Sequence, residues 1–281
     1  MGRAPDFIGL GAQRSGTSWL YACLYDHPGI CIPVKEAHFF SRERNWSKGI
    51  GWYESIFRGC SQDAKAGEVS TSYLPDADAS QRIRAHYPSV KLMACLRDPA
   101  DRAFSNYMND VKAGMIKGSV PFAAALRDHP EYIEQGRYFT HLRKYLDLFS
   151  PDQLLILLHE ESLAEPLRFM QRIYGFIGVD PSFVPSMLQA RVNVSRVPRS
   201  VGLDLLMEKG SVALRRLGLH AVWWILKRAG LGGALRSLNT AKDGGISGLS
   251  ATDRRALCEL FEEEIRGVEG LMGRSLAHWR S

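Results

Sequence analysis

The sequence lacks the features that mark several large classes of protein. Its 281 residues contain only five cysteines, with no CxxC pair, and they show no internal repeat and no low-complexity tract. With 45% hydrophobic residues the chain can bury a full core. Disordered, collagen-like and disulfide-framework proteins are therefore excluded. The scattered cysteines are expected to be ordinary reduced thiols in a cytoplasmic protein.

Long apolar runs, a targeting segment and metal-binding motifs are also missing. The longest uncharged apolar stretch of the C-terminal half, residues 217–226, has about half of the ~20 residues that a membrane helix requires. Residues 1–10 contain no cationic region followed by an apolar run, so we expect no secretory signal. The eight histidines form no HxH or HxxxH pair, and we expect metal-independent chemistry.

Acidic residues are in slight deficit, with 30 Asp and Glu against 36 Lys and Arg. The surplus of basic residues is confined to one late segment, since residues 191–236 contain nine basic and only two acidic residues. A surplus of this kind indicates an anionic partner. Composition alone does not choose among a nucleotide, nucleic acid, an anionic sugar and a membrane surface.

Apolar runs of strand length alternate with amphipathic helical stretches, as in a parallel sheet flanked by helices. The expected strands are residues 6–12, 30–34, 90–96 and 154–158. The expected helices include residues 17–25, 165–177 and 250–271, and a glycine-rich loop covers residues 243–248. We therefore predict an α/β fold with a P-loop-like parallel β-sheet flanked by helices and a helical C-terminal region.

A loop of small residues, GLGAQRSGTSW (residues 9–19), joins the first expected strand to a helix. The backbone N–H groups of residues 15–18 can converge there on an anion at the helix N-terminus, and Arg14 adds positive charge. This pattern predicts a phosphate or sulfate site. The alternative is a tight turn whose serine and threonine residues only cap the helix.

The same loop is close to the P-loop motif GxxxxGK[ST] of nucleoside triphosphatases, but it departs from it. Gly11 and Gly16 have the right spacing, whereas Thr17 stands where the lysine should be. No apolar strand ends in an aspartate suited to hold magnesium. A P-loop nucleotide kinase therefore stays only as an alternative.

A second anion motif follows the expected strand at residues 90–96. In RDPADRAFSNY, Arg97 ends the strand and Ser105 lies two helical turns into the next helix, so the two can clamp a second phosphate. The two motifs together resemble those of the bacterial-type sulfotransferases that use 3′-phosphoadenosine 5′-phosphosulfate (PAPS). Residues 136–142, 154–178 and 249–279 are also similar to that family.

The resemblance implies a role for each residue of the two motifs. The first loop would hold the 5′-phosphosulfate, the second motif the 3′-phosphate, and Trp19 would lie near the adenine. The donor-binding residues implied are Arg14, Ser15, Gly16, Thr17, Ser18, Trp19, Arg97, Ser105 and Tyr138, with a late arginine, Arg196 or Arg199, near the cofactor. The product would be adenosine 3′,5′-bisphosphate.

The segment KEAHFF (residues 35–40) resembles the KE-x-HFF motif of heparan sulfate and related carbohydrate sulfotransferases. That resemblance implies Glu36 as the general base, His38 as a group that orients or replaces it, and Arg14 or Lys35 as the charge at the transferred sulfonate. EVSTSY (residues 68–73) departs from the branch's E-K-x-P-x-Y, because Val69 replaces the lysine. Without these neighbouring motifs, KEAHFF would be read as core phenylalanines beside a solvated ion pair.

The expected enzyme transfers the sulfuryl group of PAPS to an acceptor hydroxyl, of a carbohydrate or else of a lipid or secondary metabolite. One domain is expected, with a PAPS-binding core (1–190), a basic helical segment or lid (191–248) and a returning C-terminal helix (249–281). The rival from another class is an anionic-surface binding module, resting on the basic segment. We expect no nucleic-acid partner and a possible membrane contact through residues 201–238. The oligomeric state is not encoded.

Overall fold

The computed structural model describes residues 2–188 and 248–281. The chain divides into two compact units. The larger comprises Met1–Ala103, Pro130–Asn193 and Arg254–Ser281, and the smaller comprises Phe104–His129 and Val194–Asp253. The basic segment, with Arg196 and Arg199, lies outside the described residues.

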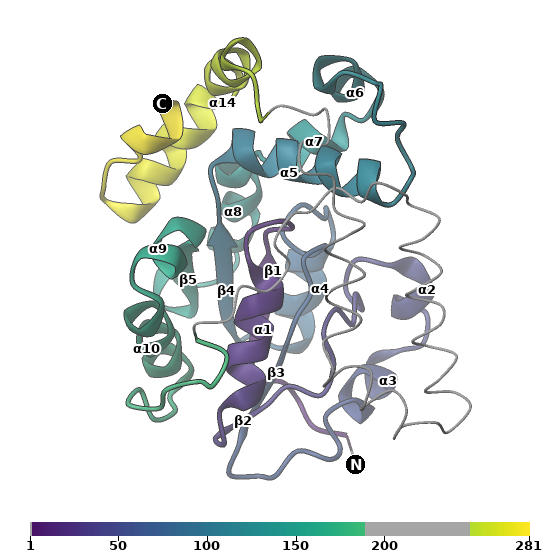
Figure 1. Ribbon diagram of the computed structural model, residues 1–281. Helices are drawn as coiled ribbons and strands as arrows, with labels where there is room; N and C mark the ends of the chain where they lie inside the picture. Colours follow the sequence, from purple (N-terminus) through teal and green to yellow (C-terminus); the bar gives the residue numbers. More distant parts are fainter. Residues whose placement is uncertain (1, 189–247) are drawn as a thin grey trace, which may run out of the picture. The chain divides into compact units, whose positions relative to one another are not determined.

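The larger unit is built on a parallel sheet, as predicted (Figure 1). Its strands are β1 (Phe7–Gly11), β2 (Ile30–Cys31), β3 (Lys65–Val69), β4 (Lys91–Leu96) and β5 (Leu154–Leu158). They lie in the order β2-β3-β1-β4-β5, and each neighbouring pair is parallel. The carboxyl ends of β1, β3, β4 and β5 therefore meet at one edge, which is where open parallel sheets bind ligands.

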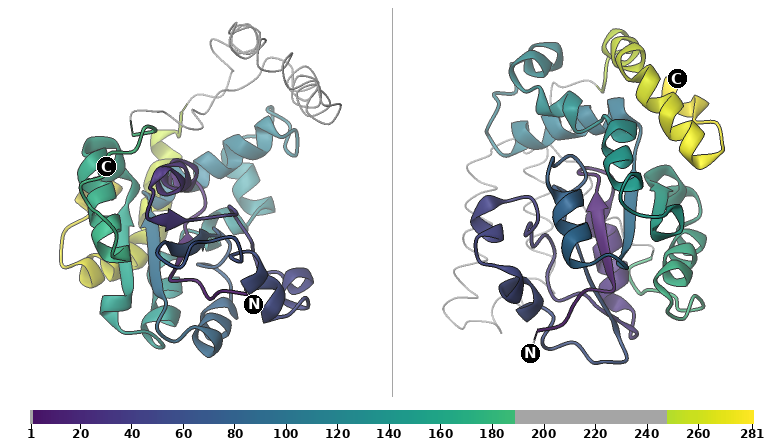
Figure 2. Two further views of the ribbon diagram at one scale, coloured as in Figure 1. Left: turned by 90° about the horizontal axis from the view of Figure 1, so that it is seen from below. Right: turned by 180° about the vertical axis from the view of Figure 1, so that it is seen from behind.

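Helices cover both faces of this sheet, which is why its strands are apolar on both sides. On one face, α1 (Thr17–Asp26) and α10 (Pro166–Ile177) pack on strand side chains that include Phe7, Met93 and Leu157. On the other face lie α4 (Ala79–His86) and α8 (Tyr138–Leu146), which the view from behind in Figure 2 shows in front of the strands. The unit also contains α2 (Glu43–Trp46), α3 (Ile50–Ser55), α7 (Glu131–Glu134), α9 (His159–Ala164) and the short 3-10 turns Pro151–Gln153 and Ala277–Arg280.

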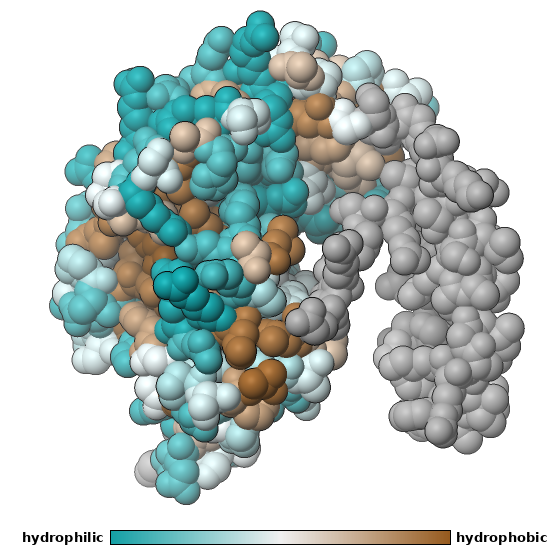
Figure 3. Space-filling view, turned by 60° about the vertical axis from the view of Figure 1, so that its left-hand side comes forward, coloured by the Kyte–Doolittle hydropathy of each residue, from teal (hydrophilic) through white to brown (hydrophobic). Residues whose placement is uncertain are grey.

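Two long helices have residues in both units, namely α5 (Pro99–Lys112) and α14 (Ala251–Met272). In the smaller unit, α6 (Phe122–Asp128) contributes Phe122, whose ring packs edge-on against Phe104 with centroids 5.2 Å apart. Tyr107 donates a hydrogen bond from its hydroxyl to the Val120 carbonyl at 2.7 Å. No helix among the described residues is long and apolar enough to span a bilayer. On the face drawn in Figure 3, hydrophobic side chains form patches among hydrophilic ones.

The prediction of five reduced thiols is wrong for one pair. Cys31 on β2 and Cys60 after α3 form a disulfide, with Cα atoms 5.6 Å apart, whereas Cys23, Cys95 and Cys258 are free. The two partners are 29 residues apart, and only the fold brings the edge strand and the turn after α3 together. Disulfides are typical of oxidising compartments, so a cytoplasmic location can no longer be argued from reduced cysteines.

Loss of this disulfide is expected to destabilise the protein. The bond closes a loop of 29 residues and thereby restricts the unfolded chain, which corresponds to about 3.5 kcal/mol. Cys60→Ser should lower the free energy of unfolding by about that amount in urea denaturation without reductant. Cys258→Ser is the matched control, because Cys258 carries a free thiol. Equal unfolding free energies for the two variants would contradict the prediction.

Candidate functional site

The loop after β1 has the geometry of an anion site. Gly16 caps α1 with a left-handed φ of 78°, and Arg14 is also left-handed, with φ 69°. The first N–H groups of α1 have no partner within the helix and lie at its positive end. Strand β4 holds the loop, because the Cys95 carbonyl accepts from the Ala12 N–H at 2.8 Å and the Cys95 thiol donates to the Ser15 carbonyl at 3.2 Å.

Gly16 must be a glycine for a second reason, which is the close approach of His159 at the start of α9. A Cβ on Gly16 would lie 2.6 Å from Nδ1 of His159. Burial, with a smaller contribution from the charge of Arg97, lowers the pKa of His159 to about 4. The imidazole is therefore neutral at pH 7. The sequence interpretation missed His159, although its place directly after a buried strand puts it at the ligand-binding edge of the sheet.

The second motif lies beside the first loop. Arg97 directly follows β4, and its Nη1 donates to the Arg14 carbonyl at 3.4 Å. The turn is fixed from α9 and α14, because Glu160 Oε1 accepts from the Asp98 N–H at 2.9 Å and Arg254 Nη1 donates to Asp98 Oδ2 at 2.9 Å. The structure thus brings Arg97 of the second motif beside the first anion loop in the larger unit. Ser105, the other predicted residue of the second motif, lies on α5.

Tyr138 and Trp19 are the two aromatic residues of the predicted set. Tyr138 begins α8 and is buried, and burial raises the pKa of its hydroxyl. Trp19 lies on α1, donates from Nε1 to the Met187 carbonyl at 3.2 Å and has its ring centroid 5.9 Å from that of Phe169. Its contact with an adenine stays a prediction.

The KEAHFF segment forms a tight turn, and three of its side chains interact with one another. Glu36 and His38 both have left-handed backbone angles, with φ 64° and 50°. Lys35 Nζ lies 3.2 Å from Glu36 Oε1, and His38 Nε2 lies 3.2 Å from Glu36 Oε2. Lys35 also donates to the Ser18 hydroxyl at 2.9 Å, so this lysine joins the turn to the first helix after the anion loop.

Glu36 is held in its ionised form. The hydrogen bond from His38 lowers the pKa of Glu36 to about 2, with further lowering by Lys35 and a partial opposing effect of burial. His38 is itself oriented by Ser72, whose hydroxyl lies 2.6 Å from Nδ1 of His38 and 2.6 Å from the Ser41 hydroxyl. A half-buried carboxylate beside a lysine and an oriented histidine can accept a proton from a bound hydroxyl.

Beneath this turn, Glu68 on β3 is fully buried and has four hydrogen-bond donors. Its Oε1 accepts from the hydroxyls of Tyr53 at 3.0 Å and Tyr73 at 2.6 Å. Its Oε2 accepts from the Ser70 hydroxyl at 2.6 Å and the Ala37 N–H at 3.2 Å. Burial raises the pKa of Glu68, while these hydrogen bonds oppose the rise.

The same network fixes the backbone of the KEAHFF turn. Three consecutive N–H groups donate into it: that of Ala37 to Glu68, that of His38 to the Ser70 hydroxyl at 2.9 Å, and that of Phe39 to the Tyr73 hydroxyl at 2.8 Å. Left-handed backbone at residues other than glycine persists only when the surroundings enforce it. Glu68 and the side chains bonded to it are those surroundings.

Val69, which stands where the carbohydrate branch has a lysine, is a core residue. Its side chain is buried on β3, and its carbonyl accepts from the Glu36 N–H at 2.9 Å. It therefore supplies no charge. Lys35 is the cation that the structure places between the loop of Ser18 and the carboxylate of Glu36.

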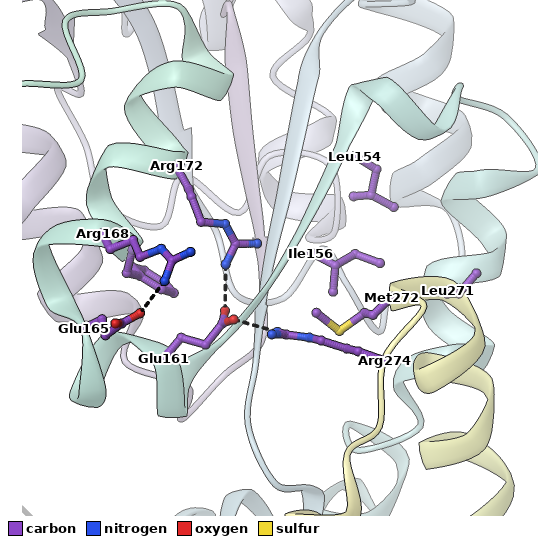
Figure 4. A pocket seen from close by; sticks show the side chains of 10 residues that line it. Leu154, Ile156, Glu161, Glu165, Arg168, Arg172, Leu271, Met272 and Arg274 are labelled. Atoms are coloured by element: carbon purple, nitrogen blue, oxygen red, sulfur yellow. Dashed lines mark hydrogen bonds and ion pairs between the residues drawn. The ribbon is translucent and has the colours of Figure 1, made fainter.

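A separate pocket of about 520 Å³ lies beside β5 and contains none of the predicted site residues (Figure 4). Arg172 and Arg274 approach Glu161 from different sides, at 3.0 and 2.7 Å, and Arg168 pairs with Glu165 at 3.2 Å. The rest of the lining is Leu154, Ile156, Phe169, Leu271 and Met272. Since all its charged groups are paired with one another, this pocket offers less to an anion than the loop after β1.

Comparison with protein families supports the resemblance seen in the sequence. The family model described as "Sulfotransferase domain" matches residues 4–196. Over its whole length the chain is similar to a crystal structure of a sulfotransferase from Alicyclobacillus acidocaldarius, with 25% identity, a TM-score of 0.72 and coverage of 99% of this chain and 100% of that chain. A mouse sulfotransferase complexed with PAP has the same fold, with 14% identity, a TM-score of 0.51 and coverage of 97% of this chain and 88% of that chain.

Among curated proteins, the matches include carbohydrate sulfotransferases. Human bifunctional heparan sulfate N-deacetylase/N-sulfotransferase 3 is 30% identical over 201 residues, which are 64% of this chain and 23% of that protein. Mouse heparan sulfate glucosamine 3-O-sulfotransferase 5 is 26% identical over 187 residues, covering 63% of this chain and 54% of that protein. The matched region thus spans about a quarter to a half of these relatives.

Proposed function

The chain belongs to the sulfotransferase family, and we propose that it transfers the sulfuryl group of PAPS to a carbohydrate hydroxyl with Glu36 as general base. The observation that carries this proposal is the position of Lys35. Its ammonium contacts Ser18 of the donor loop and Glu36 of the KEAHFF turn, at 2.9 and 3.2 Å. An acceptor hydroxyl beside Glu36 is therefore also beside the loop that would hold the donor.

The residues of the larger unit fit a nucleotide with phosphates at both ends. Arg14 and the N-terminus of α1 suit a 5′-phosphosulfate, and Arg97 suits a 3′-phosphate next to it. Gly16 allows the loop to lie close against His159, because a Cβ there would be only 2.6 Å from Nδ1 of His159. The mouse sulfotransferase of the same fold is complexed with PAP, which is adenosine 3′,5′-bisphosphate and the product that this reaction would release.

The proposed reaction is an in-line displacement at sulfur. The acceptor oxygen bonds to sulfur, the bond between sulfur and the 5′-phosphate oxygen breaks, and adenosine 3′,5′-bisphosphate leaves. Glu36, whose Oε2 lies 3.2 Å from the His38 Nε2 that donates to it, accepts the acceptor proton. Lys35, Arg14 and the N–H groups of α1 stabilise the negative charge that develops on the leaving phosphate.

A carbohydrate acceptor is supported by the relatives, which include enzymes named for heparan sulfate, and by the resemblance of KEAHFF to the KE-x-HFF motif of the carbohydrate branch. A lipid or secondary-metabolite hydroxyl is the alternative acceptor. The proposal is tested by incubating the protein with ³⁵S-labelled PAPS and a panel of desulfated glycans, alcohols and phenols. Transfer of label to a glycan supports it, and transfer only to small alcohols or phenols moves the acceptor class to the alternative.

The melting temperature measured with two different nucleotides distinguishes a kinase from a sulfotransferase. Adenosine 3′,5′-bisphosphate is expected to raise the melting temperature, because a ligand that binds only the folded state stabilises it. ATP with magnesium should raise it far less. A larger rise with ATP and magnesium than with adenosine 3′,5′-bisphosphate would overturn the assignment of PAPS as the donor.

Arg97→Ala is expected to remove the preference for a 3′-phosphate. Loss of a charge-assisted contact to phosphate corresponds to about 2 kcal/mol, or roughly 30-fold in affinity. The variant should therefore bind adenosine 3′,5′-bisphosphate about as weakly as wild type binds adenosine 5′-monophosphate, measured by isothermal titration calorimetry. Arg84→Ala is the control, since Arg84 is exposed on α4. A variant that still prefers the bisphosphate as wild type does would refute the role of Arg97.

A further inference from the structure

His38 has two conceivable roles in the KEAHFF turn, since it either orients Glu36 or replaces it as the base. The choice depends on which ring nitrogen carries a proton and which has a free lone pair. Both nitrogens lie within hydrogen-bond distance of a partner. Nε2 is 3.2 Å from Glu36 Oε2, and Nδ1 is 2.6 Å from the Ser72 hydroxyl. These two partners therefore determine the role of the ring.

The Nε2 side of the ring faces a group that can accept a hydrogen bond but cannot donate one. Glu36 is ionised, because His38 and Lys35 lower the pKa of its carboxyl to about 2. An ionised carboxylate offers only lone pairs, so the Nε2 that lies 3.2 Å away must carry a proton. The neutral imidazole has a single N–H. In that form Nδ1 is consequently an acceptor and requires a donor.

The Nδ1 side of the ring faces two hydroxyls that can supply this donor. Ser72 Oγ lies 2.6 Å from Nδ1 of His38 and 2.6 Å from Ser41 Oγ. Each hydroxyl has one proton to donate and lone pairs with which to accept. Because the Ser72 proton is used on Nδ1, the contact between the two serines must be made by the proton of Ser41. The hydrogen bonds then all run in one direction, from the two hydroxyls through the ring to Glu36.

Buried neighbours hold the two serines in place. Ser41 follows Phe40 and Ser72 precedes Tyr73, and both aromatic side chains are fully buried. The two serines are 31 residues apart in the sequence, yet their hydroxyls lie 2.6 Å apart beside the ring. A group that orients a reactive side chain must itself be fixed by packing. The serine pair meets this requirement.

We propose that Ser41 and Ser72 are positioning residues that keep the proton of the neutral His38 ring on Nε2, so that His38 serves Glu36 as a donor and is not itself the base. The inference rests on the proposed function, because it takes Glu36 as the base. In this arrangement the ring has no lone pair free for an acceptor hydroxyl, since that of Nδ1 accepts from Ser72. If the ring gains a second proton, the two hydroxyls can reverse and accept from Nδ1, and Nε2 keeps its proton toward Glu36.

The position of the ring proton can be observed by ¹⁵N NMR of the histidine side chains, because a ring nitrogen without a proton resonates far from one that carries a proton. The spectrum is recorded at a pH at which the His38 ring is neutral. The His38→Gln variant identifies its signals among those of the eight histidines. We expect a proton on Nε2 and none on Nδ1 in the wild-type protein. A proton on Nδ1 together with an unprotonated Nε2 would overturn the proposal.

Variants of the two serines are tested in the same spectrum and in single-turnover sulfuryl transfer. Ser72→Ala should move part of the neutral ring to the Nδ1–H form and lower the transfer rate about fivefold, the usual contribution of one hydrogen bond, with unchanged affinity for adenosine 3′,5′-bisphosphate. Ser41→Ala should cause smaller changes in the same direction. Ser72→Thr, which keeps the hydroxyl, should behave like wild type. Ser47→Ala is the control, because Ser47 is exposed and its hydroxyl donates to the Arg44 carbonyl at 3.3 Å.

The outcomes separate this inference from the proposed function. If the protein transfers no sulfuryl group from PAPS, the proposed function fails, whereas the NMR spectra still decide whether the serines set the tautomer. If Ser72→Ala leaves the tautomer and the transfer rate as in wild type, the serine pair is not the positioning group. An equal loss of rate in Ser72→Ala and Ser72→Thr, with an unchanged tautomer, would indicate a packing defect and would also overturn the inference. Should Ser72→Ala not fold, Ser41→Ala decides by the same two measurements.

Discussion

Glu36→Gln is expected to lower kcat by about 10²- to 10⁴-fold, the usual contribution of a general base, while adenosine 3′,5′-bisphosphate binds as tightly as to wild type. The glutamine keeps the size of the side chain but cannot take up the acceptor proton. Lys35 and Ser18 stay in place, because their 2.9 Å hydrogen bond does not involve Glu36. The measurement is single-turnover sulfuryl transfer with saturating PAPS, together with calorimetry of the product nucleotide.

The pH dependence of the transfer rate gives a second test of Glu36. Hydrogen bonding from His38 and the charge of Lys35 lower the pKa of Glu36 to about 2, so the carboxylate stays ionised as the pH falls and protonates only near that value. Any loss of rate between pH 8 and pH 4 must then come from another group. A carboxylate with so low a pKa holds a proton only weakly, so Glu36 is expected to release the acceptor proton again after each turnover.

His38→Gln distinguishes two roles for the histidine. If His38 only orients Glu36, the variant keeps part of the wild-type rate and Glu36→Gln is the slower of the two. If His38 is itself the base, the order is reversed, and near-wild-type turnover of Glu36→Gln would eliminate Glu36. Ser72→Ala is expected to lower the rate less than His38→Gln, because it removes only the 2.6 Å contact that orients the Nδ1 side of His38.

Much of the fold could be predicted from periodicity because parallel strands covered on both faces are unbroken apolar runs. The expected strands at residues 6–12, 90–96 and 154–158 match β1, β4 and β5 within two residues. Strand β3 was missed, since KAGEV contains a lysine, a glycine and a glutamate. Burial of Glu68 there depends on partners as far away in sequence as Ala37, which no local pattern encodes.

The candidate site was predictable where its groups lie in short motifs, and unpredictable where the fold assembles them. The anion loop, Arg97 and the KEAHFF turn were located by motif and now lie together in the larger unit. His159 and Glu160 were missed, because their contacts to Gly16 and Asp98 cross from α9 to two other loops. The disulfide was missed for the same reason, since Cys31 and Cys60 meet only in the folded chain.

Glu68 carries the second large prediction, because it connects stability to the shape of the KEAHFF turn. Glu68→Ala would leave the buried hydroxyls of Tyr53 and Tyr73 without their common acceptor and would release the Ala37 N–H. Each unsatisfied buried group costs about 1–3 kcal/mol, and a loss of about 3 kcal/mol or more in the free energy of unfolding is expected. Urea denaturation of the two proteins measures it.

Glu68→Gln separates stability from catalysis. It keeps the size of the side chain and one acceptor oxygen, but it places an amide donor against hydroxyls or an N–H that also donate, so the turn loses part of its support. We expect a folded protein with wild-type affinity for adenosine 3′,5′-bisphosphate and a kcat lowered at least tenfold, because Glu36 and His38 depend on this network for their left-handed backbone. Tyr25→Phe is the control, since Tyr25 is exposed on α1. A folded Glu68→Gln variant with wild-type kcat would show that the base keeps its position without Glu68.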